Sequence, residues 1–379
     1  MHIAIDGKRF FLNASGLGRY SRSLVNSLLS LEDEACLLTL FRPKGHVKFE
    51  APVHRRLRIV TADYLLPGDA GNALWRFTKF SGLINKKKYS VFHGPSHILP
   101  GKLNCPAIVT MLDLIFLRFP RYFPVFDRQY YKVMFKKSAQ QADHIISISE
   151  ATKSDLISYF DIDADKISVI YPAFDDMLTT VPDSYLQKIR STYELPKDYI
   201  LYVGNIEPRK NILRLAQAFD FLMASGGIDR ETELVVVGQK GWFYKEIFAG
   251  IERLKNREKI RFLGPVYGRD LAGLYQMALV MAYPSLFEGF GYPVLEAMQL
   301  GTPVLTSNVS SLPEAGGSAA VLIEPEQVDD IASGLEKIIN DETMREDMTS
   351  KGLAHASQFT AERMARQTMS IYRRFANCL

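Results

Sequence analysis

The sequence predicts an α/β protein made of two doubly wound, Rossmann-like domains that face each other across an interdomain cleft. The chain has 379 residues, which is more than one hydrophobic core usually serves, so two domains of similar size are expected. Short apolar runs alternate with helical patterns through both halves, as in parallel sheets with crossover helices. Hydrophobic residues make up 47% of the chain and charged residues 23%. These are ordinary globular values, so disorder is not expected.

Each half contributes six candidate strands. In the first half the apolar runs lie at residues 2–6, 37–41, 58–61, 91–93, 107–111 and 144–147. In the second half they lie at residues 199–203, 233–237, 260–262, 279–283, 304–307 and 320–323. Ligands of doubly wound folds sit at the carboxyl ends of the strands. The loops after these runs are therefore the places to look for a site.

The boundary between the domains is expected near residue 175. Residues 169–175, followed by a polar, proline-broken run to residue 183, are interpreted as a linker. This gives an N-terminal domain of residues 1–175 and a C-terminal domain of residues 176–358. Near the end of the chain an amphipathic helix is predicted over residues 360–375, because apolar or small residues share one side of it. They are Met364, Thr368, Ile371, Tyr372 and Phe375.

The most specific motif is E-G-F-G-Y-P-V-L-E-A-M at residues 288–298. It follows a predicted strand and precedes another, so the local order is strand, glycine loop, helix, strand. Pro293 fits the first helical position, and the free N–H groups of that turn favour an anionic or oxygen-rich ligand. Glu288 and Glu296 would diverge on one continuous helix. They meet one ligand only if Glu288 lies in the loop; otherwise both are solvated surface residues.

A second motif follows the predicted strand at residues 199–203. Gly204 comes first, and a turn then carries the adjacent cations Arg209 and Lys210. A guanidinium fork and an ammonium group together can neutralise a diphosphate. A solvated surface pair is the plain alternative.

In the first half, two loops after predicted strands are candidates. Gly16 and Gly18 lie between the first strand and a helix, where glycines let the backbone approach a phosphate or a sugar. This string is not the dinucleotide fingerprint. Asp113 follows the strand at residues 107–111 and is expected to face the cleft; the alternative is a turn residue or helix N-cap.

These motifs resemble those of the retaining glycosyltransferases of family four, which have the GT-B fold. The resemblance rests on residues 204–211 and 288–296, and on the N-terminal strings I-A-I-D-G-K-R at 3–9, S-G-L-G-R-Y at 15–20, H-G-P at 93–95 and S-I-S-E at 147–150. Within the family the N-terminal strings look like those of bacterial O-antigen mannosyltransferases. The resemblance covers nearly the whole chain. In the GT-B fold a terminal helix, here residues 359–379, crosses back to the N-terminal domain.

The resemblance implies a role for each candidate residue. Arg209 and Lys210 hold the diphosphate and stabilise its departure, Glu296 holds the ribose diol, and Glu288 holds the transferred sugar, with Asp113 facing it from the N-terminal domain. No covalent nucleophile and no metal are implied. The remaining implied donor contacts are Gly16, Gly18, Gly204, Val266 at the base, Phe290, Gly291 and Leu295. Relatives carry a histidine where this chain has Leu112, so either donor recognition differs or His93 or His97 supplies the contact.

The expected reaction is transfer of a hexose, with retention of configuration, to a hydroxyl of a lipid-linked glycan in cell-surface polysaccharide synthesis. The resemblance favours mannose from GDP-mannose, and the nucleotide sugar is a substrate, so no cofactor is expected. A UDP-sugar donor is the alternative within this reaction. A nucleotide-sugar epimerase and a non-catalytic sugar-nucleotide-binding protein are further alternatives.

Charge points to an anionic membrane surface as a partner. Residues 1–180 carry 24 Lys and Arg against 17 Asp and Glu, a net charge of +7, whereas the remainder has 22 against 25, a net charge of −3. Residues 116–137 and 75–88 mix aromatic and basic side chains, as interfacial segments do. Nucleic acid would use the same residue types, but the donor motifs argue against it.

The chain is expected to be cytoplasmic and peripheral on the inner face of the membrane. It shows no signal peptide and no apolar run long enough to span a bilayer. Three scattered cysteines, Cys36, Cys105 and Cys378, predict neither a disulfide framework nor a zinc site.

Overall fold

The computed structural model describes residues 1–32, 35–62, 79–174 and 178–376. The chain divides into two compact units. The N-terminal unit comprises Met1–Ala173 together with Phe359–Leu379, and the C-terminal unit is Phe174–Gln358. Each unit is an α/β body built on its own parallel sheet.

In its described residues the N-terminal unit holds seven parallel strands in the order β3-β2-β1-β4-β5-β6-β7. The strands are β1 (His2–Asp6), β2 (Leu37–Pro43), β3 (Leu57–Ala62), β4 (Val91–Gly94), β5 (Ala107–Met111), β6 (His144–Ser147) and β7 (Ile167–Val169). The helices are α1 (Lys8–Leu12), α2 (Gly16–Ser30), α4 (Ser81–Asn85), α5 (Ile115–Arg118), α6 (Val125–Gln141), α7 (Glu150–Phe160) and α16 (Ala361–Ala376), with short 3₁₀ turns η2 (Pro120–Tyr122) and η3 (Ala164–Lys166). The chain order reverses between β1 and β4, which are neighbours in the sheet.

The C-terminal unit, in its described part, has six parallel strands in the order β10-β9-β8-β11-β12-β13. They are β8 (Tyr199–Val203), β9 (Glu233–Val237), β10 (Ile260–Gly264), β11 (Val280–Tyr283), β12 (Val304–Ser307) and β13 (Ala320–Ile323). The helices are α8 (Asp183–Thr192), α9 (Ile212–Ser225), α10 (Tyr244–Ile251), α11 (Gly268–Gln276), α12 (Tyr292–Gln299), α13 (Leu312–Gly316), α14 (Val328–Asn340) and α15 (Glu342–Ala356), with 3₁₀ turns η4 (Pro208–Lys210) and η5 (Arg257–Lys259). The order reverses between β8 and β11, and this reversal is the topological switch point of a doubly wound sheet.

All twelve predicted strands are confirmed, with ends that differ by at most two residues. The strand that the sequence did not predict is β7, which pairs with β6 at the edge of the N-terminal sheet. It has three residues, too few to show a strand periodicity, and its last residue, Val169, was assigned to the linker. The predicted linker therefore overlaps the last residue of β7, and the connecting segment begins only after that strand.

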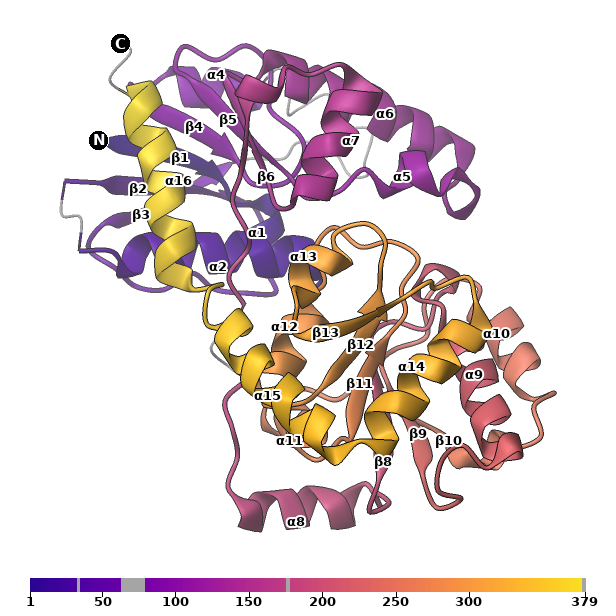
Figure 1. The fold of residues 1–379 in the computed structure, drawn as a ribbon. Helices are drawn as coiled ribbons and strands as arrows, with labels where there is room; N and C mark the ends of the chain where they lie inside the picture. The colour runs from indigo at the N-terminus through magenta and orange to yellow at the C-terminus, as the bar shows by residue number, and fades with distance from the viewer. Residues whose placement is uncertain (33–34, 63–78, 175–177, 377–379) are drawn as a thin grey trace. The chain divides into compact units, whose positions relative to one another are not determined.

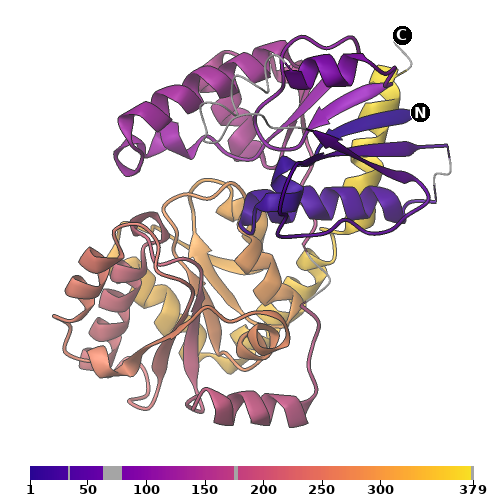
Figure 2. The same ribbon diagram turned by 180° about the vertical axis from the view of Figure 1, so that it is seen from behind.

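The last helix, α16, belongs to the N-terminal unit. It packs against α2 and β4, as both views of that unit show (Figures 1 and 2). Its buried side is the one that the sequence indicated, with Met364, Thr368, Ile371 and Tyr372 inside. The Met364 sulfur also accepts a hydrogen bond of 3.4 Å from the Ala173 amide. The helix therefore covers the sheet and anchors the end of the first chain segment.

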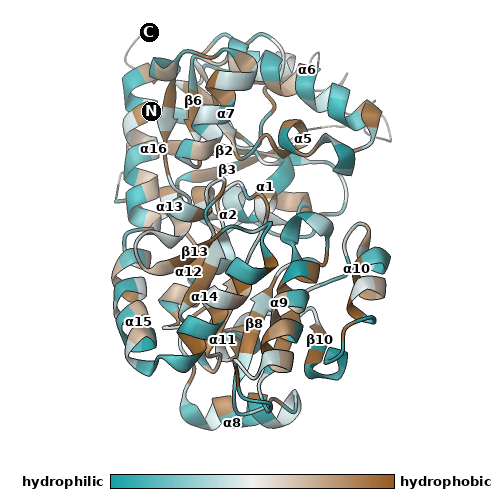
Figure 3. Ribbon diagram, turned by 45° about the vertical axis from the view of Figure 1, so that its right-hand side comes forward, coloured by the Kyte–Doolittle hydropathy of each residue, from teal (hydrophilic) through white to brown (hydrophobic). Residues whose placement is uncertain are grey.

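The strands inside each unit consist mostly of hydrophobic residues, whereas the outer helices alternate hydrophilic and hydrophobic residues (Figure 3). Several aromatics of the two segments interpreted as interfacial are core residues, which is the alternative that the sequence leaves open for about half of them: Phe80 is 0%, Phe116 2% and Phe135 8% exposed. Trp75 and Phe77, from the same interpretation, lie outside the described residues. Within the part of the chain that the structure describes, no helix is long and apolar enough to cross a membrane.

Candidate functional site

The candidate site lies at the switch point of the C-terminal sheet. The loop after β8 leads into the 3₁₀ turn that holds Arg209 and Lys210, and the loop after β11 carries Glu288. A backbone hydrogen bond of 2.8 Å from the Leu286 amide to the Arg209 carbonyl joins the two loops. Because β8 and β11 are neighbours, residues 78 and 79 positions apart in the chain meet at one edge of the sheet.

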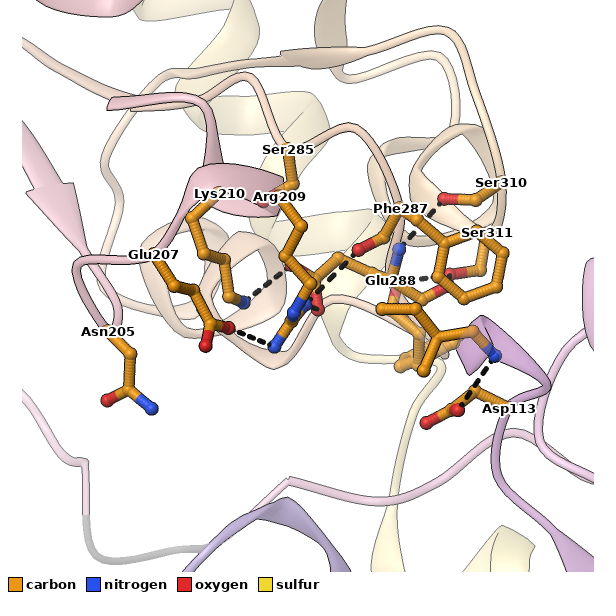
Figure 4. Close-up of polar contacts among 12 residues, drawn as sticks. Asp113, Asn205, Glu207, Arg209, Lys210, Ser285, Phe287, Glu288, Ser310 and Ser311 are labelled. Atoms are coloured by element: carbon orange, nitrogen blue, oxygen red, sulfur yellow. Dashed lines mark hydrogen bonds and ion pairs between the residues drawn. The ribbon is translucent and has the colours of Figure 1, made fainter. Parts of the chain in front are cut away.

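Four charged side chains converge there (Figure 4). The Lys210 ammonium lies 2.5 Å from Glu288 Oε1, and the Arg209 guanidinium lies 3.1 Å from Glu288 Oε2. The second guanidinium nitrogen of Arg209 lies 2.6 Å from Glu207 Oε1. The Lys210 and Glu288 side chains are only 9% and 11% exposed. Two cations and two anions therefore share one nearly buried cluster, which we call the ion cluster.

Burial and charge act in opposite directions on Glu288. Burial alone would raise its pKa, but the charges of Lys210 and Arg209 outweigh burial and lower the pKa to about 2. Burial lowers the pKa of Lys210 to about 8, although Glu288 opposes this change. Both groups are therefore charged at neutral pH, and Lys210 begins to lose its proton in mildly alkaline solution.

A tyrosine hydroxyl joins the two central members of the ion cluster. The hydroxyl of Tyr283, the last residue of β11, accepts a hydrogen bond from the Lys210 ammonium and donates one of 3.0 Å to Glu288 Oε1. Burial raises the pKa of this phenol well above its usual value, so it keeps its proton. Its ring stacks on Tyr202 of β8, with centroids 6.0 Å apart.

The backbone around Glu288 is held by the loop after β12. The Glu288 amide donates to Ser310 Oγ at 3.1 Å, and Ser311 Oγ lies 2.9 Å from the carbonyl oxygens of both Glu288 and Phe290. Gly291 caps α12 with φ of 118°, and a Cβ there would lie 2.9 Å from Leu312. Only glycine fits that combination of backbone angle and space. The loop is thus fixed on both sides of Glu288.

Glu288 has little capacity left for a ligand. A carboxylate offers about four acceptor positions, and Lys210, Tyr283 and Arg209 occupy three of them. Arg209 also donates to the Phe287 carbonyl at 3.2 Å. Glu288 therefore orients the two cations, and about one position remains for a hydroxyl of a bound molecule.

The other carboxylate of the motif, Glu296, has a different environment. It is 4% exposed and accepts a hydrogen bond of 3.0 Å from the Tyr275 hydroxyl. The Tyr275 carbonyl in turn accepts one of 2.7 Å from Thr302 Oγ1, so α11, α12 and the turn before β12 are joined. The loop-then-helix arrangement that the sequence predicted for the two glutamates is present, with Glu288 in the loop and Glu296 inside α12.

The remaining candidates in this unit are mostly enclosed. Val266 is 7%, Phe290 3% and Leu295 0% exposed, so the Leu295 side chain packs inside the unit. Gly204 follows β8, and its amide donates to the Val237 carbonyl at 2.9 Å. Its backbone thus ties the ends of two neighbouring strands at the edge of the sheet that carries the ion cluster.

In the N-terminal unit, Gly16 and Gly18 open the first turn of α2; they do not form the loop that the sequence predicted. The short helix α1 occupies part of the segment in which the loop was expected. Asn13 Oδ1 accepts hydrogen bonds from the amides of Ser15 at 2.8 Å and Gly18 at 3.2 Å. A Cβ on Gly18 would lie 1.8 Å from the Asn13 carbonyl oxygen, whereas one on Gly16 would meet no atom within 4 Å. Gly18 is required for packing, and Gly16 leaves its surroundings open.

Asp113 follows β5, and its Oδ1 accepts a hydrogen bond of 3.1 Å from the Ile115 amide. This is an Asx turn that starts α5. The Asp113 and Leu112 amides both donate to His97 Nε2, at 3.3 and 3.1 Å. Burial lowers the pKa of His97 to about 3, so its ring is neutral and Nε2 acts as an acceptor. His97 therefore fixes the turn that presents Asp113.

The histidines proposed as substitutes at position 112 are engaged within the protein. His97 stacks on Phe135 at 4.4 Å. His93 is fully buried, with Nδ1 2.5 Å from the Tyr372 hydroxyl and Nε2 2.8 Å from Thr110 Oγ1. With both of its ring nitrogens bonded inside the core, His93 has no free group for a sugar hydroxyl. That alternative is wrong for His93, and the Nε2 atom of His97 is likewise committed to the backbone.

Sequence similarity covers both units. A family model described as "Glycosyl transferases group 1" matches residues 187–355, and one described as "Glycosyltransferase Family 4" matches residues 14–177. The O-antigen chain mannosyltransferase B of Escherichia coli is 33% identical over 370 residues, which are 95% of this chain and 96% of that protein. The chain belongs to glycosyltransferase family 4. Family 4 is a hexosyltransferase family.

Solved structures place this family 4 enzyme in the GT-B fold. A sucrose-phosphate synthase of Thermosynechococcus elongatus has a TM-score of 0.79 at 19% identity, with all of both chains covered. The HepE protein of Anabaena, crystallised with UDP and glucose, has a TM-score of 0.74 at 19% identity and covers 98% of this chain and 99% of its own. At such identities the likeness concerns the fold.

Two residues of this candidate site are not indicated by the sequence: Glu207 of the ion cluster, and Tyr283, which joins two members of that cluster. In the sequence Tyr283 is only the end of an apolar strand, and Glu207 lies in the basic motif without a role. A polar group on the last residue of a strand that precedes a charged loop is the signal that would have indicated Tyr283. No such signal marked Glu207, because its ion pair with Arg209 depends on the shape of a 3₁₀ turn.

Proposed function

We propose that this family 4 enzyme transfers a hexose from a nucleoside diphosphate to a hydroxyl of a lipid-linked glycan, with retention of configuration. The ion cluster carries the proposal. A buried ion pair contributes little net stability, because desolvation offsets the attraction. Two cations held at a topological switch point, the usual ligand position of this fold, are better explained by an anionic ligand such as a diphosphate.

Arg209 and Lys210 are the proposed diphosphate ligands. In the transfer, the bond between the sugar carbon C1 and the phosphate oxygen breaks, and a bond from C1 to the acceptor oxygen forms. The acceptor proton goes to the departing phosphate, so no side chain acts as a covalent nucleophile. Negative charge grows on the diphosphate as it leaves, and preorganised cations in a nearly dry site stabilise that charge without a metal.

The remaining roles are proposals for the same donor. Glu288 gives its spare acceptor position to a hydroxyl of the transferred sugar, next to the backbone of Phe290 and Gly291. Glu296 serves the ribose, because a carboxylate accepts hydrogen bonds from hydroxyl groups and Tyr275 holds this one in place. The backbones of Gly204 and Val266 lie at strand ends and suit the nucleotide. Gly16, Gly18 and Asp113 are the candidates from the N-terminal unit.

The donor is proposed to be GDP-mannose. The support is the 33% identity to an O-antigen mannosyltransferase over nearly the full length of both proteins. A UDP-sugar is the rival donor, because a solved neighbour of the same fold holds UDP and glucose. The acceptor is proposed to be a lipid-linked glycan of cell-surface polysaccharide synthesis, as the name of the E. coli relative suggests.

A lipid-linked acceptor calls for contact with a membrane, and α6 is the proposed contact. One side of this helix packs inward through Phe135, Ser138 and Ala139. The other side exposes a second apolar stripe, with Val125 60%, Phe126 89%, Tyr130 40% and Val133 57% exposed. Arg128, Lys132, Lys136 and Lys137 accompany it against one acid, Asp127.

The composition of this stripe favours an anionic lipid surface on the cytoplasmic side. Aromatic and aliphatic groups insert into the headgroup region while the lysines remain beside lipid phosphates. Two of its four members, Val125 and Val133, have no aromatic face for a nucleic-acid base to stack on. A second copy of the same stripe would bring lysines against lysines. The enzyme is therefore proposed to be peripheral on the inner membrane surface.

A thermal-shift panel tests the donor proposal. The purified chain is heated with GDP-, UDP- and ADP-sugars, and GDP-mannose is expected to raise Tm more than the others. Formation of GDP that depends on an acceptor would support a transferase. Conversion of the sugar without acceptor would indicate an epimerase, and stabilisation without any sugar release would indicate a binding protein. Stabilisation by none of the panel would overturn the proposal.

A further inference from the structure

We propose that Tyr283 is a positioning residue of this enzyme: its hydroxyl ties the Lys210 ammonium to the Glu288 carboxylate and so orients Lys210 toward the diphosphate. The inference rests on the proposed function of the ion cluster. It adds a residue that neither the sequence motifs nor the family resemblance assigned.

The geometry around Tyr283 leaves its side chain one position. The residue is 1% exposed, and its ring is stacked on that of Tyr202 in the neighbouring strand β8. The Lys210 nitrogen lies 4.8 Å from the ring centroid and also donates to the hydroxyl. The hydroxyl hydrogen points the other way, to Glu288 Oε1 at 3.0 Å. One side chain thus contacts both partners of the buried ion pair.

Only one arrangement of protons satisfies the three groups. An ammonium group has donors only, and an ionised carboxylate has acceptors only, whereas a phenol has a donor and an acceptor. The hydrogen bonds must therefore run from Lys210 to Tyr283 and from Tyr283 to Glu288. In a buried site a group that loses its partner is costly, so the hydroxyl holds both charged groups in this orientation.

This arrangement leaves a defined donor on Lys210. An ammonium group has three N–H bonds, and two of them are directed to Tyr283 and Glu288. The third is available for a phosphate oxygen. Without the hydroxyl, the ammonium would still pair with Glu288 but would rotate about that single contact. Lys210 would keep its positive charge, but its third N–H bond would no longer point in a fixed direction.

The charged and titratable groups that face Lys210 set the pH behaviour of such a change. They are Glu288 from the loop after β11, Arg209 from the 3₁₀ turn, Glu207 at the N-cap of that turn and Tyr283 from β11; Tyr202 of β8 contacts the Tyr283 ring. Burial already lowers the pKa of Lys210 to about 8. Removal of an acceptor from the ammonium disfavours its charged form and lowers this pKa further. Arg209 repels the ammonium, so it cannot stabilise the charged form of Lys210 in place of the lost hydroxyl acceptor.

The test is the Tyr283→Phe variant, which removes one oxygen atom and keeps the ring. Steady-state kinetics are measured for the full chain with the nucleotide sugar that the thermal-shift panel selects, across neutral and alkaline pH. We expect kcat to fall about tenfold while the donor KM changes less than about threefold. The orientation of the Lys210 ammonium matters most when negative charge develops on the diphosphate in the transition state. The alkaline limb of kcat should move to lower pH by about one unit.

Tyr199→Phe is the matched control. Tyr199 is also fully buried in this sheet, and its hydroxyl donates to the Leu274 carbonyl at 2.6 Å, away from the ion cluster. It should lose a similar amount of stability and keep the kcat and the pH profile of the wild type. A Tyr283→Phe profile that matches that of Tyr199→Phe would show a merely structural hydroxyl and would overturn the proposal.

A double-mutant cycle supplies a readout that does not depend on turnover. Dissociation constants for GDP and for UDP are measured by calorimetry in Tyr283→Phe, Lys210→Met and the double variant. If Tyr283 acts through Lys210, adding Tyr283→Phe to Lys210→Met should change Kd less than about twofold. Full additivity of the two losses would overturn the proposal.

Two outcomes separate this inference from the proposed function. If the wild-type chain binds neither nucleotide and turns over no sugar, the proposed function fails. If the wild type is active and the alkaline fall in kcat occurs at the same pH in Tyr283→Phe as in the wild type, only the positioning role fails. Should Tyr283→Phe lose its cooperative thermal transition, 4-aminophenylalanine at position 283 replaces it. Its amino group can still donate to Glu288 but is a poor acceptor for Lys210, so an unshifted limb there also overturns the inference.

Discussion

The two units share a strand order at their centres but differ in the side chains placed there. In the C-terminal unit the switch point between β8 and β11 holds the ion cluster, with Arg209 and Lys210 against Glu288. In the N-terminal unit the switch point lies between β1 and β4. There β1 ends in the buried Asp6, while His93 of β4 and Thr110 of β5 belong to a network of neutral groups. His93 bonds to Thr110 and Tyr372, and Thr110 lies 3.1 Å from the Tyr20 hydroxyl.

The difference shows that the strand order fixes where the switch point lies, whereas the side chains there determine whether it stabilises the unit or can bind a ligand. The neutral network of the N-terminal unit joins α2, β4, β5 and α16, so it holds that unit together. The ion cluster of the C-terminal unit joins two loops and keeps cations in a nearly buried place, which suits an anionic ligand better than it suits stability. Four predictions can break or sharpen this comparison.

The largest expected effect is on catalysis. Lys210→Met should lower kcat/KM about a thousandfold, because the departing diphosphate loses a preorganised charge in a low-dielectric site. Donor turnover by the purified chain measures it. Lys259→Met, which removes a half-exposed ammonium 3.4 Å from Glu231, is the control. A loss below about tenfold for Lys210→Met would contradict the assignment of the ion cluster as the diphosphate site.

The next effect concerns stability in acid, where the N-terminal unit should be the weaker. Burial lowers the pKa of His93 and of His97 to about 3 and that of His144 to about 4. The unfolded chain binds protons near pH 6.5, whereas the folded unit does not until much lower pH. Stability is therefore lost as pH falls below about 6.5, by about 3 kcal/mol for His93 and His97 together at about pH 5.5.

Hydrogen exchange with mass spectrometry at about pH 7 and about pH 5.5 localises this loss. Peptides from β4 and β5 should lose protection before those from β8 and β11. The ion cluster is not expected to weaken in this range, because the pKa of Glu288 is lowered to about 2 and its stabilising effect fades only below about 4.5. Equal loss of protection in both sheets would remove this distinction between the units.

The third prediction concerns the outer surface of the N-terminal unit. The double variant Phe126→Ser, Val133→Ser should weaken binding to phosphatidylglycerol vesicles about thirtyfold, because two exposed apolar groups no longer enter the lipid. Vesicle sedimentation measures it, with phosphatidylcholine vesicles for comparison. Val53→Ser with Leu353→Ser, two exposed apolar residues outside α6, is the control. A loss of the same size in the control would count against α6 as the contact.

The smallest effect is expected at the end of the chain. Tyr372→Phe removes the hydroxyl that His93 Nδ1 contacts, leaving a fully buried ring nitrogen without this partner. We expect about 1 kcal/mol less stability and a nucleotide Kd equal to that of the wild type. Thermal unfolding and calorimetry measure the two quantities. A large change in nucleotide Kd would mean that the neutral network also serves the donor site.

Much of the fold was predictable because its signals are local. An apolar run such as residues 233–237, bounded by polar residues, indicates a buried parallel strand by itself. The three-residue β7 carries no such pattern and was missed. Gly16 and Gly18 were expected in a loop, but Asn13 turns the chain and accepts their helix's first amide bonds. That arrangement depends on hydrogen bonds from backbone amides to one side-chain oxygen, which composition does not reveal.

The placement of the candidate residues at one sheet edge was predictable, but their electrostatics were not. The order of residues in the chain indicated that Arg209, Lys210 and Glu288 follow strands, and parallel strands end at a common edge. It did not indicate that Glu288 neutralises both cations, that Tyr283 links the pair, or that Glu207 binds the far side of Arg209. Those pairings depend on which strands are neighbours and on distances of a few ångströms.

The amino-acid sequence by itself determined the two parallel sheets, the loops that carry charge and the family, since these follow from patterns over short stretches of chain. The tertiary structure alone decided which polar groups face each other across those loops. It made His93 a neutral core residue and Lys210 a paired, nearly buried cation. The physical reason is that burial removes water as a hydrogen-bond partner, so each buried polar group must pair with a group that folding places next to it.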